Sequence, residues 1–521
     1  MMLDPTQLQQ QHLYYTNSAQ ETGCQAALAS TVIARVVIDN TEPGPKISID
    51  RLQTPDRGRI MVAASFIPEG ALIGAIPPQA ITCDTAHRTK RCGKCLGPTS
   101  CNNENGNRGG PGTIACEGCC EIWYCDERCR VQDWDAVHKY ECKFLKRLYN
   151  GNGQEEEGSQ RQSNDDDERY IEKFREMGDY ERDYCRLMIR ILIHRFKEHL
   201  LPQFEDSSRP REQEPDDGEP LPFSCVLDLV ENRSGFSKEL IEGNFLNVAR
   251  IMDAFQTVLE QNSCEMQKPN RSQLDGSLKG VGEVEVGGGI PRLSLDELVG
   301  LVLREECNSF GLYEYGPTIE AAPTGTSSTS NSRIGYGLGL YIRNFLHSFN
   351  HSCTPNLYHV ASKDRQLVYA ARDISQGEEL NIKYMEFTPE YRIPNAEQRR
   401  QEKERSLVKE LDRKIAFEKR RAFLKEIFHF DCACQRCRWE LSMNWGSSQP
   451  ETSREEEEEE KFLREGLVCE RDGCYGFYAP PVVLELMRRN TTSYVEKQQQ
   501  LQGEEAEVGQ WECVACGRQR G

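Results

Sequence analysis

The feature that most constrains this chain is a cysteine-dense segment at residues 92–142. Most of it has no helical or strand period, so it cannot build an apolar core by itself. A Cys-x-x-Cys turn presents two thiolates from one loop, and a His and a Cys four residues apart lie on one face of a helical turn. Eight ligands predict two closed, structural zinc sites. They occur in order as the pairs Cys92-x-x-Cys95, Cys116-x-x-Cys119, Cys125-x-x-x-Cys129 and His138-x-x-x-Cys142.

The expected compartment favours metal binding over disulfides for the 23 cysteines. Residues 1–15 hold Asp4, Pro5 and many Gln, without the apolar run of a signal peptide. No window approaches a run of about 18 apolar residues, so no membrane span is expected. In a reducing compartment, close cysteine pairs are interpreted first as metal ligands, and a buried set of free thiols is the alternative.

The net charge of −19 argues against DNA or RNA as a direct partner. Phosphate-dominated binding needs clustered Lys and Arg, and the chain has no basic patch beside aromatic residues. A basic partner, such as a Lys-rich protein tail, fits an acidic chain better.

Outside the cysteine-dense segment, the apolar pattern predicts an α+β fold. Short apolar runs broken by Gly and Pro indicate strands and turns at 47–82 and 334–384. Helical periodicity appears at 180–196, 236–262, 293–307 and 395–429, and acidic, Gly-rich or Ser-rich tracts separate these segments.

Several further motifs follow one another along the chain. Alone, each is weak, because an Asn-His pair is usually a turn and a Tyr after an apolar strand is usually packing. Their order makes them informative. They are Asp56-Arg57-Gly58-Arg59-Ile60, Cys307-Asn308-Ser309-Phe310, Asn350-His351-Ser352-Cys353, Gly377-Glu378-Glu379-Leu380-Asn381-Ile382-Lys383-Tyr384 and Phe430-Asp431-Cys432-Ala433-Cys434-Gln435-Arg436-Cys437.

Together with Trp123-Tyr124-Cys125 and His138-Lys139-Tyr140-Glu141-Cys142, these motifs resemble the SET and MYND domain-containing protein family. In that family a MYND zinc finger splits a SET methyltransferase domain. The resemblance implies a SET core of short strands with a knot-like segment, an inserted MYND finger, a helical insertion and a C-terminal zinc-bound and helical region. The expected segments are an irregular lead at 1–45, the N-terminal SET part at 46–91, the MYND finger at 92–142, an acidic linker at 143–179, the helical insertion with low-complexity loops at 180–333, the SET catalytic core at 334–394, a helix and post-SET zinc motif at 395–440, and a C-terminal region with a zinc ribbon at 441–521.

The resemblance also implies an activity, the transfer of a methyl group from S-adenosylmethionine to a lysine of a histone or another protein. Tyr384 matches the catalytic tyrosine, and Phe430 would line the lysine channel. A proline-rich peptide is a possible partner of the MYND finger, and the nucleus, the cytoplasm or both are the expected locations. The expected cofactor-binding residues are Arg57, Arg59, Asn308, Asn350, His351 and Phe430.

The zinc ligands are also assigned by resemblance. In the MYND finger the two sites would interleave, with Cys101 and Cys120 as spare thiols. One ion would bind Cys92, Cys95, Cys125 and Cys129, and the other Cys116, Cys119, His138 and Cys142. A third ion, bound by Cys353, Cys432, Cys434 and Cys437, would pin the C-terminal cap onto the active site.

Two more cysteine pairs near the C-terminus, Cys469-x-x-x-x-Cys474 and Cys513-x-x-Cys516, are spaced like a zinc ribbon. A fourth zinc ion is therefore expected there, and two unconnected reduced pairs are the alternative.

Two departures from the family keep a second function open. Ile60 replaces a glycine of the first motif, and its side chain could narrow the cofactor pocket. His347 stands where the family often has a small residue. The alternative to the enzyme is therefore a protein-interaction adaptor with a catalytically inactive SET core, although Tyr384, Asn350 and His351 favour the enzyme.

Overall fold

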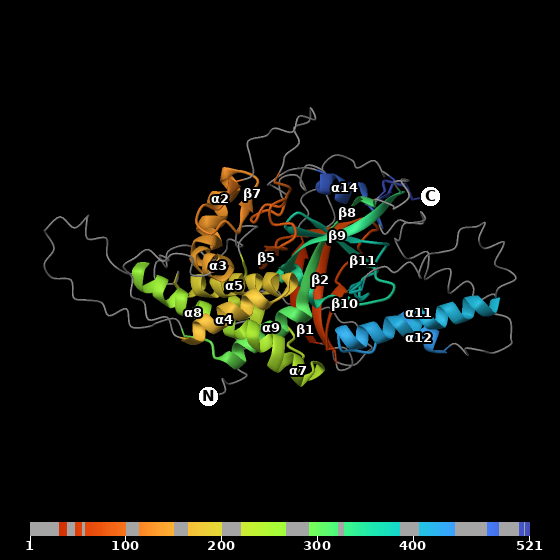
Figure 1. Ribbon diagram of the computed structural model, residues 1–521. Coiled ribbons are helices and arrows are strands. Elements are labelled where there is room, and N and C mark those ends of the chain that lie inside the picture. The colour runs from red at the N-terminus through yellow and green to blue at the C-terminus, as the bar shows by residue number, and fades with distance from the viewer. Residues whose placement is uncertain are drawn as a thin grey trace, which may run out of the picture. The chain divides into compact units, whose positions relative to one another are not determined.

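The computed structural model describes twelve stretches of the chain, which belong to two compact units. The first unit comprises Met1–Ile76, Glu314–Ile334 and Asn344–Gly521, and the second comprises Pro77–Tyr313 and Gly335–Arg343. No helix in the described stretches has the length and apolar character needed to cross a membrane. The described residues are 31–38, 47–54, 58–99, 114–150, 165–200, 220–266, 291–320, 328–385, 406–442, 477–488, 510–514 and 516–520 (Figure 1).

The first sheet of the first unit is antiparallel, in the order β1-β2-β3. Its strands are β1 (Thr31–Ile38), β2 (Ile47–Thr54) and β3 (Gly58–Ala63). Strand β1 lies in the segment expected to be irregular, because a single Val- and Ile-rich run does not reveal its partner strand in the sequence. The register pairs Thr31 with Gln53 and Ile38 with Ile47.

The second sheet has the order β11-β12-β4 and is also antiparallel. It contains β4 (Leu72–Ile76), β11 (Leu357–Ser362) and β12 (Arg365–Ala370). Strands β11 and β12 form a hairpin whose two-residue turn begins at Lys363, with a φ of 57°. Such a left-handed turn matches the twist of the strands that it joins.

C-terminal segments bury one side of this second sheet. They are β14 (Tyr478–Ala479), α14 (Pro481–Arg488) and β15 (Glu512–Cys513). The Tyr369 hydroxyl donates a hydrogen bond to the Tyr478 carbonyl at 2.9 Å, and the Trp511 ring lies 5.9 Å from that of Tyr369. The C-terminal segments are therefore part of the hydrophobic core of the first unit.

A short parallel pair joins β10 (Asn350–His351) to β13 (Asn381–Ile382). The amide of Ser352 extends this pairing by donating to the Ile382 carbonyl at 3.0 Å. Segment 377–380 also lies along β3, because the amide of Leu380 donates to the Met61 carbonyl at 2.7 Å. The turn before it needs glycine at Gly377, where φ is +83°.

Two helices complete the first unit, α11 (Ser406–Ile427) and α12 (Gln435–Ser442). Figure 1 shows them running beside each other. Phe417 and Leu424 are buried seven residues apart on α11, as expected for one face of a charged helix. Arg420 forms a buried ion pair with Glu440, which ties α11 to α12.

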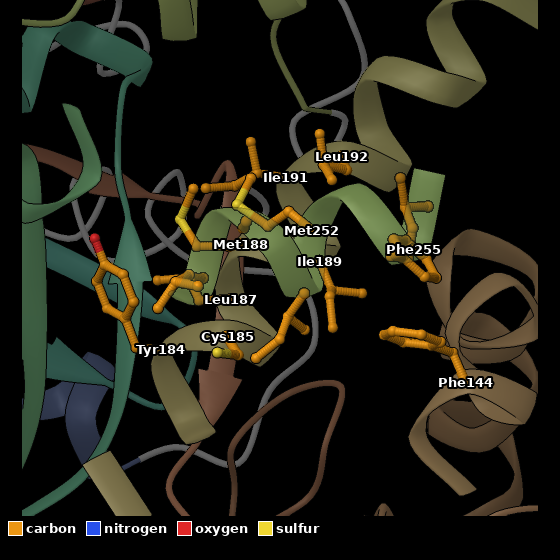
Figure 2. Close-up of a cluster of buried hydrophobic side chains, with 14 of the residues drawn as sticks. Phe144, Tyr184, Cys185, Leu187, Met188, Ile189, Ile191, Leu192, Met252 and Phe255 are labelled. Atoms are coloured by element: carbon orange, nitrogen blue, oxygen red, sulfur yellow. The ribbon is translucent and has the colours of Figure 1, made fainter. Parts of the chain in front are cut away.

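The second unit is built mainly from helices that pack around α5 (Asp179–Leu200) and α8 (Leu246–Met266). Tyr184 to Ile193 are buried on all sides of α5. Figure 2 shows hydrophobic side chains of this stretch together with Phe144 and Phe255, whose rings are 5.1 Å apart. The others are α4 (Asp165–Glu176), α6 (Phe223–Leu227), η4 (Arg233–Gly235), α7 (Lys238–Leu240), η5 (Ile241–Phe245) and α9 (Leu295–Asn308).

The cysteine-dense segment belongs to this second unit and is more regular than its sequence predicts. A two-stranded pair, β6 (Ile114–Ala115) and β7 (Trp123–Tyr124), precedes α2 (Glu127–Asp133), η2 (Trp134–His138) and α3 (Lys139–Asn150). The Asp126 carboxylate caps α2 by accepting from the Cys129 amide at 2.7 Å. The cap fixes the helix that carries Cys129.

One more sheet has the order β5-β9-β8. Strand β5 (Ala80–Cys83) pairs with the end of β9 (Ser328–Leu340), from Ala80 with Leu340 to Cys83 with Gly337. Strand β8 (Ser309–Glu320) follows α9, and the 3₁₀ helix η6 (Arg343–Ser348) follows β9.

Candidate active site and metal centres

The two interleaved cysteine sets of the finger lie at metal-binding distances. The ligand atoms of Cys92, Cys95, Cys125 and Cys129 all lie within 4.8 Å of one another. The Cys95 and Cys125 sulfurs are 3.9 Å apart. Tetrahedral zinc–sulfur bonds of about 2.3 Å separate two sulfurs by about 3.8 Å, whereas a disulfide holds them at about 2.05 Å. The arrangement therefore fits a metal ion.

The second set, Cys116, Cys119, His138 and Cys142, is fully buried. The His138 Nε2 lies 3.1 Å from the Cys116 sulfur and 3.6 Å from the Cys119 sulfur. Cys119 lies in this set, whereas its neighbour Cys120 is exposed and has a φ of 60°. The spare thiol Cys101 lies outside the described residues.

A buried charged network surrounds the second set. Glu141 is fully buried, and its Oε1 lies 3.2 Å from the other ring nitrogen of His138, Nδ1. Arg190 of α5 donates to the same oxygen at 2.8 Å, to Asp133 at 3.4 Å and to the Gly93 carbonyl at 3.3 Å. Burial alone would raise the pKa of Glu141, but Arg190 and His138 lower it to about 2. Such a carboxylate orients a metal-binding histidine.

The third cysteine set joins β10 to the segment before α12 in the first unit. The ligand atoms of Cys353, Cys432, Cys434 and Cys437 lie within 4.8 Å of one another, and all four residues are buried. The Cys353 and Cys437 sulfurs are 3.5 Å apart. Within the first unit, a metal ion here would fix α12 to the Asn350–His351 strand.

Tyr384 follows β13 and is held at two points. Its amide donates to His351 Nδ1 at 3.0 Å, and its hydroxyl donates to the Phe349 carbonyl at 2.8 Å. The opposite ring nitrogen of His351, Nε2, lies 3.4 Å from the Cys353 sulfur. One imidazole therefore connects the tyrosine to the third cysteine set.

Three aromatic rings surround the Tyr384 ring. The ring centroids of Phe428, His351 and Phe430 lie 5.1, 5.5 and 6.3 Å from it. The helix α11 ends just before Phe428, and His429 has a φ of 60°, so the chain reverses there. Phe430, expected to line the lysine channel, lies in this aromatic cluster.

Asn350 lies beside three elements of the first unit. Its amide nitrogen donates to the Arg59 carbonyl at 3.1 Å and to Glu379 Oε1 at 3.3 Å. The neighbouring Asn356 fixes the same region, because its amide donates to the Glu379 carbonyl at 2.8 Å and its oxygen accepts from the Asn381 amide at 2.8 Å. The first and third motifs of the sequence thus meet at one place.

Asn308 belongs to the second unit, and the hydrogen bonds described for its side chain are to residues of that unit. Its side-chain amide donates to the Arg304 and Val230 carbonyls at 2.6 and 3.0 Å. Its cofactor role stays a prediction. Arg57, Cys469 and Cys474 lie outside the described residues. Cys513 and Cys516 form a tight turn, in which the Gly517 amide donates to the Cys513 carbonyl at 2.9 Å, and the fourth zinc ion stays a prediction.

Ile60 has the geometry of an ordinary strand residue. It lies in β3, where it pairs with Leu52 of β2, and it is half-buried. The position that needs glycine is Gly58, with a φ of 66°. The backbone at Ile60 therefore does not require a glycine.

The sequence analysis missed several residues that position these groups. Glu379 belongs to the Gly377–Tyr384 motif but had no predicted role, and Asn356 was not among the predicted site residues. Arg190 had one weak signal, a recurring arginine in a helix of apolar residues. The aromatic neighbour Phe428 and the carbonyl of Phe349 had none, since backbone groups are invisible to motif reasoning.

The β10–β13 pairing, the tyrosine held beside it and the cysteine sets define a class of protein. A family model described as "SET domain" matches residues 58–385, more than half of the chain. The chain therefore belongs to the SET domain family, and the predicted α+β fold is confirmed.

Some known relatives are named for a MYND domain as well as a SET domain. A SET and MYND domain-containing protein of Dictyostelium discoideum is 22% identical over 73% of this chain and 78% of its own length. Histone-lysine N-methyltransferase ASHR1 of Arabidopsis thaliana is 21% identical over 81% of this chain and 59% of its own. Histone-lysine N-methyltransferase SMYD3 of Homo sapiens is 23% identical over 75% and 61%. The resemblance to SET and MYND proteins is confirmed.

Proposed function

We propose that this chain is an S-adenosylmethionine-dependent protein-lysine N-methyltransferase with Tyr384 as its catalytic residue. The observation that carries the proposal is the fixed Tyr384 hydroxyl, 2.8 Å from the Phe349 carbonyl and next to the Asn350–His351 strand. Relatives named histone-lysine N-methyltransferases support the reaction class.

The residues around Asn350 fit the cofactor. When bound, S-adenosylmethionine would supply a methyl carbon on a sulfonium, to which the nitrogen of a neutral amine would bond in line as the carbon–sulfur bond breaks and the thioether leaves. Among the described residues, no donor reaches the buried Oδ1 of Asn381, which pairs with Asn350 across β10 and β13. This oxygen and the Glu379 carboxylate are acceptors suited to the α-ammonium group of an amino acid. Asn350, Asn381 and Glu379 would therefore hold the amino-acid end of the cofactor.

Tyr384 and its neighbours act on the lysine. The Tyr384 hydroxyl proton is directed at the Phe349 carbonyl, so two oxygen dipoles lie side by side and can stabilise the positive charge that moves with the methyl group. The rings of Phe428 and Phe430 exclude water and attract an ammonium by cation–π contact. The lysine must lose its proton before it reacts, because an ammonium has no lone pair.

Zinc is the metal that these cysteine sets fit best, and its role is structural. Each of the three sets provides four ligands, which closes a tetrahedral site and leaves no open position for catalysis. Zinc held by Cys353, Cys432, Cys434 and Cys437 would keep Phe428 and Phe430 beside Tyr384.

A histone or another Lys-rich protein is the substrate that suits the acidic chain. The finger is proposed to bind a proline-rich peptide, as in SET and MYND proteins. The proposed location is the nucleus, the cytoplasm or both.

A methyl-transfer assay tests the reaction. Zinc-loaded protein is incubated with S-adenosylmethionine carrying a tritiated methyl group and with core histones, and the label in protein is counted. We expect label with the wild type and at least about a hundredfold less with Tyr384→Phe. Histones whose lysine side chains have been acetylated serve as the blocked control, because an amide nitrogen is not nucleophilic. Equal transfer by Tyr384→Phe would contradict the assigned role, and no transfer to any lysine protein would favour the adaptor.

A further inference from the structure

The carboxyl end of α9 in the second unit carries two adjacent acids where helices usually carry bases. The negative end of the helix dipole favours Lys, Arg or His in the last turn, and α9 has none there. Its last turn instead contains Glu305 and Glu306, and Arg304 just before them is paired with Glu231 at 2.8 Å. Sequences that break such a local rule without compensation do so most often at functional sites.

Glu305 is buried without a partner. It is 1% exposed, and no donor among the described residues reaches either of its carboxylate oxygens. The nearby Tyr184 hydroxyl donates instead to the Val302 carbonyl at 2.7 Å. Burial and then the neighbouring Glu306 raise the pKa of Glu305 to about 8. The nearby side chains of Tyr184 and Ser309 lower this pKa in part, whereas no Lys or Arg of the described residues does so. An acid in this position lacks a cation.

Two tyrosines of α5 lie beside this acid pair. Tyr180 is 61% exposed, and its ring lies 6.4 Å from that of the buried Tyr184, with an angle of 28° between the two planes. After burial, Glu306 and Glu305 are the groups that most raise the pKa of Tyr180. The acids and the tyrosines therefore act on one another across the α5–α9 contact, and Tyr180 is the part that solvent reaches.

We propose that Glu305, Glu306, Tyr180 and Tyr184 form a binding site for the alkylammonium group of a lysine side chain from a protein partner. Tyrosine faces attract organic cations, and the half-buried Glu306 can accept a charge-assisted hydrogen bond. The buried Glu305 adds a second negative charge beside it. A metal ion fits less well, because no third His, Cys, Asp or Glu of the described residues gathers with the pair. The site concerns binding alone and holds whether or not the first unit transfers a methyl group.

A binding assay on the full zinc-loaded chain tests the proposal. The probe is a fluorescein-labelled oligolysine peptide, measured by fluorescence anisotropy, with the same peptide acetylated on its side chains as the uncharged control. We expect Glu305→Gln and Tyr180→Ala each to weaken binding about tenfold. Glu172→Gln on α4 is the matched control, because it removes one exposed negative charge from the same unit, and it should change binding less than about twofold.

The pH dependence gives a second readout. Bound lysine favours the ionised Glu305, so binding by the wild type should tighten as the pH rises from about 6 to 8, and Glu305→Gln should lose this dependence. The titratable groups around Glu305 are Glu306 and Cys307 on α9, Tyr180 and Tyr184 on α5, and Glu231. Among these groups, Glu306 is the second carboxyl whose ionisation could cause the pH dependence of binding, so it should be tested after Glu305.

Each of three results would overturn the proposal. Equal weakening by Glu305→Gln and Glu172→Gln would show that the peptide senses only the net charge. Equal binding of the acetylated peptide would show that the ammonium is not recognised. Failure of the wild type to bind would remove the site altogether.

Discussion

At the scale of single residues, His351 links Tyr384 to the third cysteine set. Its Nδ1 accepts from the Tyr384 amide and its Nε2 lies 3.4 Å from the Cys353 sulfur. We expect His351→Phe, which keeps a ring but removes both nitrogens, to speed zinc release from the third cysteine set and to slow methyl transfer about tenfold or more. Zinc release to a coloured chelator is the measurement.

A matched control for this variant is His359→Phe on β11. His359 is a half-buried histidine of the same unit, and its Nδ1 lies 3.1 Å from Gln366 Oε1. Identical zinc release from the two variants would show that His351 does not support the metal ion.

Arg190 is a single side chain on which the finger depends. It is 4% exposed and joins Glu141, Asp133 and the Gly93 carbonyl. Removing one partner of a buried ion pair leaves charges uncompensated, so Arg190→Met should lower the free energy of unfolding by about 3 kcal/mol. Denaturant unfolding provides the measurement.

Arg130→Met makes the same change in the exposed pair with Glu127 on α2. It should cost less than about 1 kcal/mol. If the two variants were equally stable, the network around His138 would have no structural importance.

The unpaired Glu305 predicts an unusual pH dependence of stability. Its pKa is about 8 in the folded chain and about 4.3 in the unfolded chain, so the folded state holds its proton more tightly. The contribution of this bound proton to the free energy of unfolding is complete below about pH 4.3. It is lost as the pH rises towards 8. We expect Glu305→Gln to be more stable than the wild type at pH 8, by an amount on the order of 3 kcal/mol, and the difference to shrink at pH 5.

Thermal unfolding of both proteins at the two pH values checks this prediction. A Gln variant that is less stable than the wild type at pH 8 would mean that the carboxylate is stabilised by a contact of its own.

At the scale of elements, the C-terminal segments are structural parts of the SET unit. The Trp511 ring lies close to Gly70, where an added Cβ would be 3.4 Å from it, and packs on Tyr369. The Arg520 guanidinium lies 5.5 Å from the centre of the Trp511 ring. Truncating such a contact exposes the face of β11-β12-β4, so Trp511→Ala should cost about 3 kcal/mol. Phe66→Ala, at a side chain that is 55% exposed in the same unit, should cost under about 1 kcal/mol. Denaturant titration distinguishes the two, and equal costs would contradict the packing role.

Some helices and strands could be predicted from the sequence, and others could not. The helices at α5 and α9 followed from their periodicity, and the Ser294–Glu297 capping box marks the start of α9. The strand β1 was expected to be irregular, because its hydrogen-bonding partner β2 lies across a gap that no local pattern encodes. Pairing between distant segments is set by tertiary contacts and not by propensity.

At the scale of the whole molecule, the ligand types and spacings made the metal centres predictable. Thiolate pairs a few residues apart have few other uses in a reduced protein, and the described structure brings together three of the four predicted sets. It also gathers a buried group that was not predicted, Asp133, His138 and Glu141. The buried charges around them were not predictable in this way. Arg190 and Glu141 lie 49 residues apart in sequence, and only folding shows that they meet.

The central claim is that the first unit binds S-adenosylmethionine, and calorimetry on the zinc-loaded full chain tests it most directly. We predict micromolar affinity, weakened at least about tenfold by Asn350→Ala, because the amide of Asn350 organises the Arg59 carbonyl and Glu379. Wild-type affinity in the variant would contradict the assigned site. No binding by the well-folded, zinc-replete wild type would contradict the enzyme and leave the adaptor as the better account.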